Sequence, residues 1–363
     1  MTEFRHQPVY IHAAAALGPQ GDYTAARRNP LHTDPAPLEL KELTRSVVGQ
    51  PLRQASHFVE LAVIGAQLCL QRLGLPTHAI TAVYLGTGLA EVNKTTALFN
   101  QVMPPGPGLA SPFDFINSAN NMAAFYVAKR AQFSARNLTI TEEEFSFEWA
   151  LRLAQQDMRY AGFDQTLVGG VDENSRPRAD HLRRISLRPD QPMGEGSGWL
   201  YLTKHPTGAK GELLCVEQIA LPPKMSLGTW ATSVASCIKQ NVGDAQEPLH
   251  LLPGFRLSLG DISALRSKLP RAEVFNYLEY CGCYHTASAF GIAMMFDEPV
   301  AAASRVFHVN RDVAGRTMVV GVRRVPRILG PIPDHVIPSP SGRGVGVRVL
   351  LPDRARSRAG LNS

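Results

Sequence analysis

The stretch that decides how this chain folds is Asn137–Ser175, NLTITEEEFSFEWALRLAQQDMRYAGFDQTLVGGVDENS. Residues 137–141 predict a short strand, residues 142–160 a helix, and residues 165–171 a second strand. A strand, a helix and a strand in this order form a crossover unit, which places helices against the faces of a mostly parallel sheet. The stretch therefore predicts an α/β fold.

The flanking sequence continues the same alternation. Residues 8–13 predict the first strand and residues 80–85 another. Residues 52–74 predict a helix, because Phe58, Leu61, Ile64 and Leu68 recur at three- and four-residue spacing. A small-residue helix is expected over 117–134 and a surface loop over 102–114. A second series of strands and helices runs from about 213 to 322, so we expect two successive α/β halves.

Composition bounds the class of protein. A chain of 363 residues with 44% apolar and 19% charged residues can bury a large core. The formal net charge is +6, but residues 336–363 contribute five arginines against one aspartate, a net +4, which leaves about +2 for the rest. This balance gives no nucleic-acid footprint, although an acidic protein partner is compatible with it.

The five cysteines are Cys69, Cys215, Cys237, Cys281 and Cys283. Their number and spacing fit neither a disulfide framework nor a zinc site, which favours a reducing compartment. The N-terminal residues show no secretion signal, and no apolar run approaches the ~18 residues of a membrane helix. We expect a cytoplasmic protein with no membrane insertion, no metal and no cofactor. Gly86-Thr-Gly88 is interpreted as a tight strand exit, and Cys281-Gly-Cys283 as small-residue packing.

Three segments together resemble the β-ketoacyl synthases. They are 137–175, 187–202 (LRPDQPMGEGSGWLYL) and 282–291 (GCYHTASAFG), in the family's order and spacing. The resemblance covers roughly residues 8–325. It implies the thiolase-like fold, in which two pseudo-symmetric α/β halves form a layered α-β-α-β-α core. It also implies an N-terminal half at 1–205, a shortened C-terminal half at 206–327 and a flexible basic tail at 328–363.

The resemblance also places the reactive centre. It puts the nucleophile position at Glu144, where the family has cysteine, and matches the second active-site histidine to His285. The first histidine position falls at Pro253, three residues from His250, and the family's lysine is replaced by Tyr280. The glycine-rich closing loop is altered as well, to residues 312–316. A condensing enzyme needs a thiolate and two histidines, so these departures imply lost condensation.

Glu144 and His285 both have purely structural interpretations. Thr141 and Glu144 have the spacing of a helix capping box, in which Glu144 would reach back to the cap; alternatively, its carboxylate fills or shapes an acyl site. His285, among small residues, can be a satisfied buried polar group. Ser146 is the nearest hydroxyl but has no base nearby in the sequence.

The resemblance implies a non-catalytic subunit similar to a chain-length factor. Such a subunit pairs with a cysteine-bearing ketosynthase paralogue as a heterodimer, in polyketide, aryl-polyene or fatty-acid-like biosynthesis on acyl carrier protein. The Ala-rich face at 122–128 is then either a dimer or tunnel element or ordinary core. One alternative is an enzyme acting alone, such as a malonyl-carrier-protein decarboxylase or another ketosynthase-like acyltransferase. Another is a scaffold that recruits carrier protein without touching the acyl chain.

Overall fold

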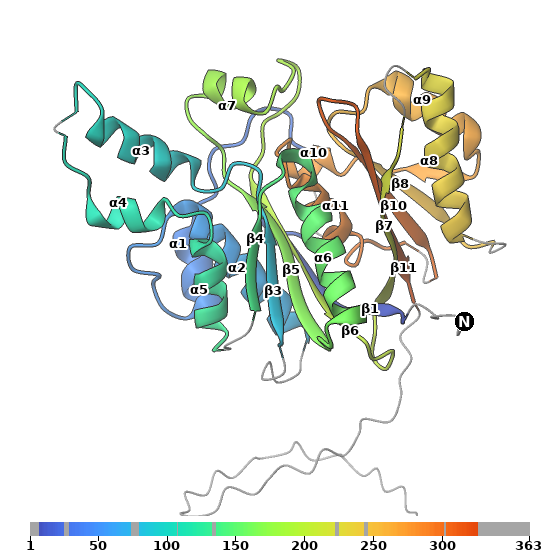
Figure 1. Ribbon diagram of the computed structural model, residues 1–363, viewed down its shortest axis with the longest axis horizontal. Coiled ribbons are helices and arrows are strands. Elements are labelled where there is room, and N and C mark those ends of the chain that lie inside the picture. The colour runs from blue at the N-terminus through green and yellow to red at the C-terminus, as the bar shows by residue number, and fades with distance from the viewer. Residues whose placement is uncertain are drawn as a thin grey trace, which may run out of the picture. The chain divides into compact units, whose positions relative to one another are not determined.

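The computed structural model of the chain (Figure 1) describes most of residues 7–325. The described ranges are 7–24, 29–73, 80–106, 108–132, 136–221, 225–242, 246–300 and 303–325. The expected tail at 328–363 lies outside them. None of the described helices is both long and apolar enough to span a membrane.

The N-terminal strands form one side of a continuous sheet. In spatial order they are β4 (Arg136–Ile140), β3 (Ala82–Gly86), β5 (Gln165–Asp172), β6 (Gly196–Thr203) and β1 (Val9–Gly18). β3 runs parallel to β4 and β5, and β6 runs antiparallel to β5 and β1. The short β2 (Gly21–Asp22) pairs with the end of β1. The crossover expected from 137–175 is therefore confirmed, with β3 between its two strands.

The C-terminal strands repeat this arrangement. Their spatial order is β9 (Ala272–Val274), β8 (Leu249–Pro253), β10 (Arg305–Arg311), β11 (Thr317–Arg324) and β7 (Gly211–Ile219). β8 runs parallel to β9 and β10, and β11 runs antiparallel to β10 and β7, as in the first half. β1 and β7 pair antiparallel where the two series meet. The expected pseudo-symmetry is therefore present in the topology, while the boundary at 205/206 stays a prediction.

Helices make the remaining layers. The central layer holds α6 (Ser146–Tyr160) and α11 (Ala287–Met294), whose buried side chains share one core with strands of both halves. α2 (His57–Leu73) and α5 (Met122–Arg130) cover the outer face of the N-terminal strands. α8 (Leu227–Val242) and α9 (Leu259–Lys268) cover the outer face of the C-terminal strands. The layer order α-β-α-β-α confirms the expected fold class.

The apolar periodicity of α2 and the small residues of α11 explain these layers. Phe58, Leu61, Ile64 and Leu68 are all buried against the sheet, as their spacing predicts. All eight residues of α11 are buried. A Cβ at Gly198 on β6 would lie 2.1 Å from the α11 backbone, so only glycine lets the helix pack this closely.

Two helices precede the small-residue helix. The first lies in a stretch for which the sequence predicted no element, and the second overlaps the loop predicted at 102–114 and the first residue of the helix predicted at 117. α3 (Val92–Val102) and α4 (Pro112–Asn117) form an extension at the edge of the N-terminal half (Figure 1). Ser111 caps α4 and Pro112 occupies its first turn, so proline here begins a helix rather than excluding one. The small-residue helix begins at Met122 rather than at 117, and Ala123, Ala124 and Val127 are buried in the core.

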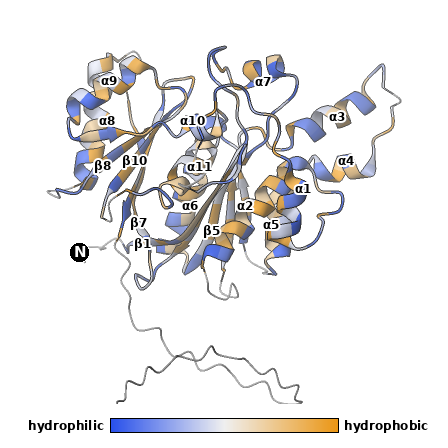
Figure 2. Ribbon diagram, turned by 180° about the vertical axis from the view of Figure 1, so that it is seen from behind, coloured by the Kyte–Doolittle hydropathy of each residue, from blue (hydrophilic) through white to orange (hydrophobic). Residues whose placement is uncertain are grey.

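Shorter elements complete the chain. They are α1 (Leu40–Leu43), the π-helix η2 (Thr44–Val48), the 3-10 turn η3 (Glu143–Phe145), α7 (Arg178–Arg184) and α10 (Leu278–Cys281). Coloured by hydropathy, α3 and α4 carry apolar segments although they project from the layers (Figure 2).

Candidate functional site

Glu144 lies in the 3-10 turn that leads into α6, and its side chain is buried. The capping-box interpretation is wrong. The residue at the cap is Glu142, whose side chain makes no capping bond, and the Glu142 amide donates instead to Ser146 Oγ, 2.9 Å away. The Ser146 hydroxyl therefore accepts the hydrogen bond within this turn. The Glu144 carboxylate instead contacts Arg256 of the C-terminal half.

Arg256 is the principal partner of Glu144. Its Nε donates to Glu144 Oε1 at 2.5 Å, and its Nη2 donates to the same oxygen. Nη2 also donates to the carbonyl of Ile185 at 2.6 Å, and Nη1 donates to that of Ser186 at 3.3 Å. Arg256 follows the end of β8, so the guanidinium joins three segments that are distant in sequence.

His285 approaches the same carboxylate oxygen as Arg256. Its Nδ1 is 3.5 Å from Glu144 Oε1, and its ring makes an edge contact with Phe255 at 6.4 Å between centroids. The structure therefore brings the two predicted site residues together. Burial by itself would raise the pKa of Glu144, but the hydrogen bond and charge of His285 and the guanidinium of Arg256 outweigh it and lower that pKa. Glu144 is thus an ionised carboxylate.

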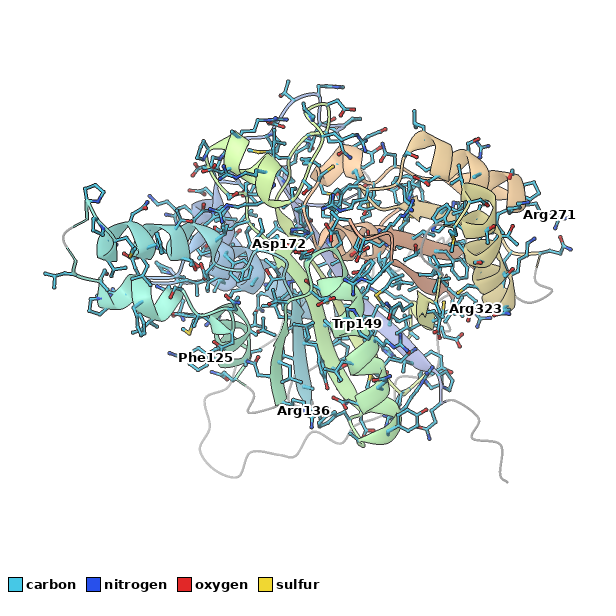
Figure 3. The ribbon with its side chains drawn as sticks, turned by 45° about the horizontal axis from the view of Figure 1, so that its top comes forward. Phe125, Arg136, Trp149, Asp172, Arg271 and Arg323 are labelled. Carbon is cyan, nitrogen blue, oxygen red and sulfur yellow. The ribbon has the colours of Figure 1, made fainter. Side chains whose placement is uncertain are left out.

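Asp172 holds the loops around this site. Its Oδ1 accepts hydrogen bonds from the Thr87 hydroxyl and from the amides of Gly88 and Leu89, all at 2.9 Å. Its Oδ2 accepts from the amide and hydroxyl of Thr286 at 2.9 and 2.8 Å. Figure 3 labels Asp172 at the end of β5. One carboxylate thus fixes the loop after β3 and the turn that carries His285.

Gly88 explains why the loop after β3 can approach so closely. A Cβ at this position would lie 2.3 Å from Cβ of His285, so any side chain would displace the histidine. The interpretation of Gly86-Thr-Gly88 as a tight strand exit is compatible with this geometry. The exit also shapes the site, which the sequence interpretation did not anticipate.

A second set of buried polar side chains lies next to Glu144. Asn310 on β10 donates through Nδ2 to the Glu144 carbonyl at 2.6 Å and to Glu148 Oε1 at 2.8 Å. His308 Nδ1 is 3.7 Å from the same Glu148 oxygen, and His308 Nε2 is 2.9 Å from the Tyr277 hydroxyl. Burial raises the pKa of Glu148 to about 7 and lowers the pKa of His308 to about 3, so at neutral pH Glu148 is only partly ionised and His308 is neutral.

The remaining positions implied by the resemblance lie elsewhere. His250, on β8, faces Glu273, with 3.6 Å between Nδ1 and Oε2. Tyr280 packs its ring against those of Tyr23 and Phe275. Arg256 and Asn310 were missed, because no local motif distinguishes an arginine or asparagine that meets a residue more than 100 positions away.

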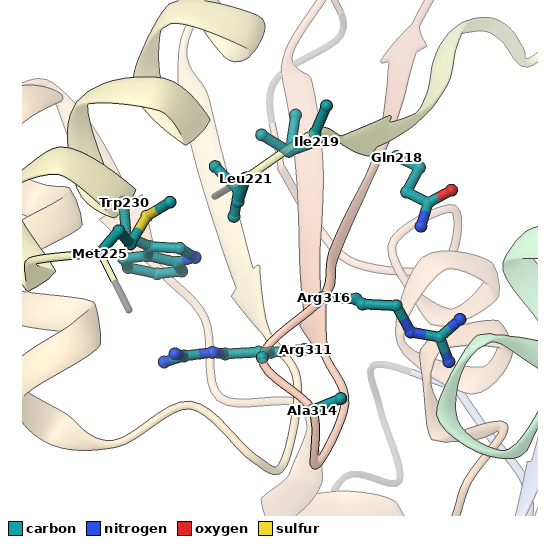
Figure 4. Close-up of a pocket in the computed structure, with 10 residues that line it drawn as sticks. Gln218, Ile219, Leu221, Met225, Trp230, Arg311, Ala314 and Arg316 are labelled. Carbon is teal, nitrogen blue, oxygen red and sulfur yellow. The ribbon is translucent and has the colours of Figure 1, made fainter. Parts of the chain in front are cut away.

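The turn between β10 and β11 borders the site. A hollow of about 320 Å³ lies on one side and is lined in part by Arg188, Phe255, Arg256 and Asp312. A second hollow of about 470 Å³ lies on the other side, between this turn and Trp230 (Figure 4). The two hollows share Arg311 and Gly315. Arg256, which lines the first hollow, is the residue that forms the salt bridge with Glu144.

No family model and no curated protein matches this sequence. Solved structures do match. The chain superposes on "The ishigamide ketosynthase/chain length factor" with a TM-score of 0.71 and 17% identity, covering 88% of this chain and 100% of that one. This chain has the ketosynthase fold.

Two further ketosynthase structures agree. One is titled "AntDE:AntF (apo): type II PKS acyl-carrier protein in complex with its ketosynthase bound to the hexaketide" and matches with a TM-score of 0.65 and 12% identity over 88% of this chain and 100% of that one. A β-ketoacyl synthase from Burkholderia phymatum STM815 matches with a TM-score of 0.60 and 13% identity over 88% and 100% of the two chains. At such identities the likeness establishes the fold alone.

Proposed function

We propose that this chain is a non-condensing ketosynthase subunit, similar to a chain-length factor, that pairs with a cysteine-bearing ketosynthase on acyl-carrier-protein-bound polyketide or polyene intermediates. The observation that carries the proposal is the salt bridge of Glu144 with Arg256. A carboxylate held by a guanidinium and a histidine cannot accept an acyl chain as a thiolate does, because a carboxylate is a weak nucleophile and its attack on a thioester would give an anhydride. The fold is retained while the nucleophile is absent.

Decarboxylation by this chain alone is disfavoured by the same geometry. Loss of CO₂ from a malonyl thioester leaves an enolate, which needs donors and positive charge at the developing oxyanion. Here the cation and the histidine already face an ionised Glu144. A second negative charge beside this carboxylate is repelled, so the alternative of an independent decarboxylase has no support from the charges at the site.

An exposed apolar surface supports the pairing. Of the fourteen large apolar side chains that are exposed among the described residues, nine belong to α3, α4, the segment joining them, α5 or β4. They are Phe99, Val102, Met103, Leu109, Phe113, Phe115, Ile116, Phe125 and Leu138. We call this set the apolar edge. A patch of this kind on a folded chain marks a protein interface.

The strand next to the apolar edge strengthens this argument. β4 is the outermost strand of its half in the described sheet, so one row of its backbone N–H and C=O groups has no strand partner. An open edge flanked by apolar side chains favours pairing with another chain. A homologous synthase offers the same kind of edge, which suits an approximately two-fold assembly.

Reconstitution tests the proposal. The full chain is co-expressed with a cysteine-bearing ketosynthase from the same organism and supplied with holo-carrier protein and malonyl units. We expect an equimolar complex, and we expect extended product only when both chains are present. Product from this chain alone, or an unchanged product spectrum when it is omitted, would overturn the proposal.

A matched pair of variants tests the surface. Phe115→Glu introduces a charge into the apolar edge, and Leu259→Glu introduces one at the 86%-exposed Leu259 on α9. We expect Phe115→Glu to weaken association at least tenfold, while Leu259→Glu leaves it unchanged, as measured by size-exclusion chromatography with light scattering. Equal behaviour of the two variants would exclude this surface without excluding pairing elsewhere.

A further inference from the structure

The extension formed by α3 and α4 is held to the rest of the chain mainly by polar contacts at the start of α3. Val92 is the one buried residue of α3, and Asn117 is the one buried residue of α4. The backbone amide of Asn93 donates to Glu173 Oε1 at 3.2 Å, and the Asn93 side chain donates to the carbonyl of Asn174 at 2.9 Å. Because little apolar surface holds the extension, the polar groups at this point decide how firmly it is attached.

Glu91 directly precedes α3 and is 1% exposed. Its Oε1 accepts a hydrogen bond from the Ser56 hydroxyl at 2.5 Å, and the same hydroxyl accepts from the Val59 amide at the start of α2. Glu91 Oε2 is buried and has no hydrogen-bond partner among the described residues. Lys94, one turn further along, pairs with Asp114 instead, at 3.0 Å. A buried carboxyl group with one orphaned oxygen and no bound cation is stable only as the neutral acid.

The other charged groups around the start of α3 do not supply the missing cation. They come from α2, from the end of β5 and the loop after it, from the residue before β6, and from α3 and α7. They are His57, Glu60, Asp172, Glu173, Glu195, Lys94 and Arg184. His57 is bound to Glu195, with 2.9 Å between Nε2 and Oε1. Arg184 donates to the Thr96 hydroxyl at 3.4 Å. Burial and the charge of Glu173 therefore outweigh the Ser56 hydrogen bond and raise the pKa of Glu91 to about 8.

We propose that the α3–α4 extension is attached to the rest of the chain through a proton held on Glu91, and that loss of this proton opens the attachment as the pH rises. The extension carries five residues of the apolar edge, namely Phe99, Val102, Phe113, Phe115 and Ile116. The proton therefore controls how this surface is presented. The inference goes beyond the proposed function and does not depend on it, because it concerns the chain by itself.

The direction of the pH effect follows from the two forms of the attachment. In the open form the Glu91 carboxyl is hydrated and has its ordinary pKa of 4.5, whereas in the closed form its pKa is about 8. The closed form is fully favoured below the lower value. Its equilibrium constant over the open form falls about tenfold for each pH unit between the two values, and it falls no further above the higher one.

Amide hydrogen exchange of the full chain, measured by mass spectrometry between pH 5 and 8 and corrected for the intrinsic exchange rate, tests the proposal. Glu91→Gln keeps the shape of the protonated carboxyl but does not titrate. We expect the protection of residues 93–102 to fall about tenfold per pH unit more steeply in the wild type than in this variant. Because Glu173 and His57 titrate in both proteins, the difference isolates Glu91. Protection of α8 should be the same in both. Equal slopes for residues 93–102 would overturn the proposal.

Asp114→Asn is the matched control. It removes the ion pair with Lys94 inside the extension, and hydrogen bonds from Gln101 and Lys94 lower the pKa of Asp114, so this group does not titrate between pH 5 and 8. We expect a loss of protection by the same factor at each pH, with the slope of the wild type. A slope as flat as that of Glu91→Gln would show that loosening of the extension, and not the proton on Glu91, sets the pH dependence.

A second variant keeps the proposal open to refutation if Glu91→Gln does not fold. Glu91→Met is also unable to titrate and has an unbranched side chain of similar length, so it should give the same flat slope. The wild type provides a further check without any variant. If the protection of residues 93–102 in the wild type falls no more steeply with pH than that of α8, the proposal is overturned.

Discussion

Glu144 and Glu148 are the same residue type, one turn apart and both buried, yet they differ in charge. Glu144 contacts Arg256 and His285, and its pKa is lowered. Glu148 contacts Asn310 and the neutral His308, and burial raises its pKa to about 7. The difference shows that the partner from the other half of the molecule, rather than position on the helix, decides the charge of a buried carboxylate.

Of the changes considered, removal of the Arg256 guanidinium should have the largest effect on stability. Arg256→Met leaves the Glu144 carboxylate buried without its guanidinium, which we expect to lower the free energy of unfolding by about 3–5 kcal/mol at pH 7 in urea titrations. The double variant Glu144→Gln/Arg256→Met removes the charge as well and should recover much of the loss. Equal stability of the single and double variants would show that the charge is not the cause.

The pH dependence of stability should distinguish the contribution of Glu148 from that of Glu144. Its pKa is raised, so between pH 5 and 7 the folded state holds a proton that the unfolded state releases, and the free energy of unfolding falls as pH rises. Compared with Glu148→Gln, the wild type should lose about 2 kcal/mol over this interval. Measurements at pH 5, 6 and 7 test this. Parallel curves for the two proteins would contradict it.

For Glu144 the pH dependence of stability should have the opposite sign and should fall in a more acidic range. Its pKa is lowered, so its contribution to stability is complete above the pKa of the unfolded state and is lost as pH falls through the folded value. Compared with the wild type, Glu144→Gln should have a flatter stability curve below about pH 4.5. The effect should be smaller than that for Glu148, because burial of Glu144 opposes the pKa-lowering effect of Arg256 and His285. A steeper acid limb in the variant would refute the assignment.

Glu142 forms an exposed ion pair that can be compared with the buried pair of Glu144 and Arg256. Its removal should have the smallest effect on stability. It pairs with Arg316 at 3.0 Å, and both side chains are more than one-third exposed. Glu142→Gln should change the free energy of unfolding by at most about 1 kcal/mol. Chemical denaturation in low and high salt measures this. A loss comparable to that of Arg256→Met would mean that burial is not what separates the two ion pairs.

The local elements were largely predictable from the sequence. The helix at 142–160 and the strand at 165–171 are confirmed within a few residues, because their apolar residues recur with the period of the element that buries them. α3 and α4 were not predicted. Each buries only one residue, and the proline-containing stretch 102–114 was interpreted as a loop although Pro112 in fact starts α4.

The candidate site was predictable only in part. The resemblance selected Glu144 and His285, and the structure brings both to one point. The sequence favoured helix capping for Glu144 because a capping box is defined by three neighbouring positions. It gave no indication of Arg256, because a salt bridge between residues 112 positions apart leaves no local pattern.

The sequence by itself determined the alternation of strands and helices, the two-part organisation and the absence of a cysteine at the position where α6 begins. Only the tertiary structure decided that Arg256 neutralises Glu144 and that Asp172 fixes the turn carrying His285. The physical reason is the distance along the chain over which each interaction acts. Burial periodicity acts over a few residues, whereas charge pairing depends on how layers far apart in the chain pack together.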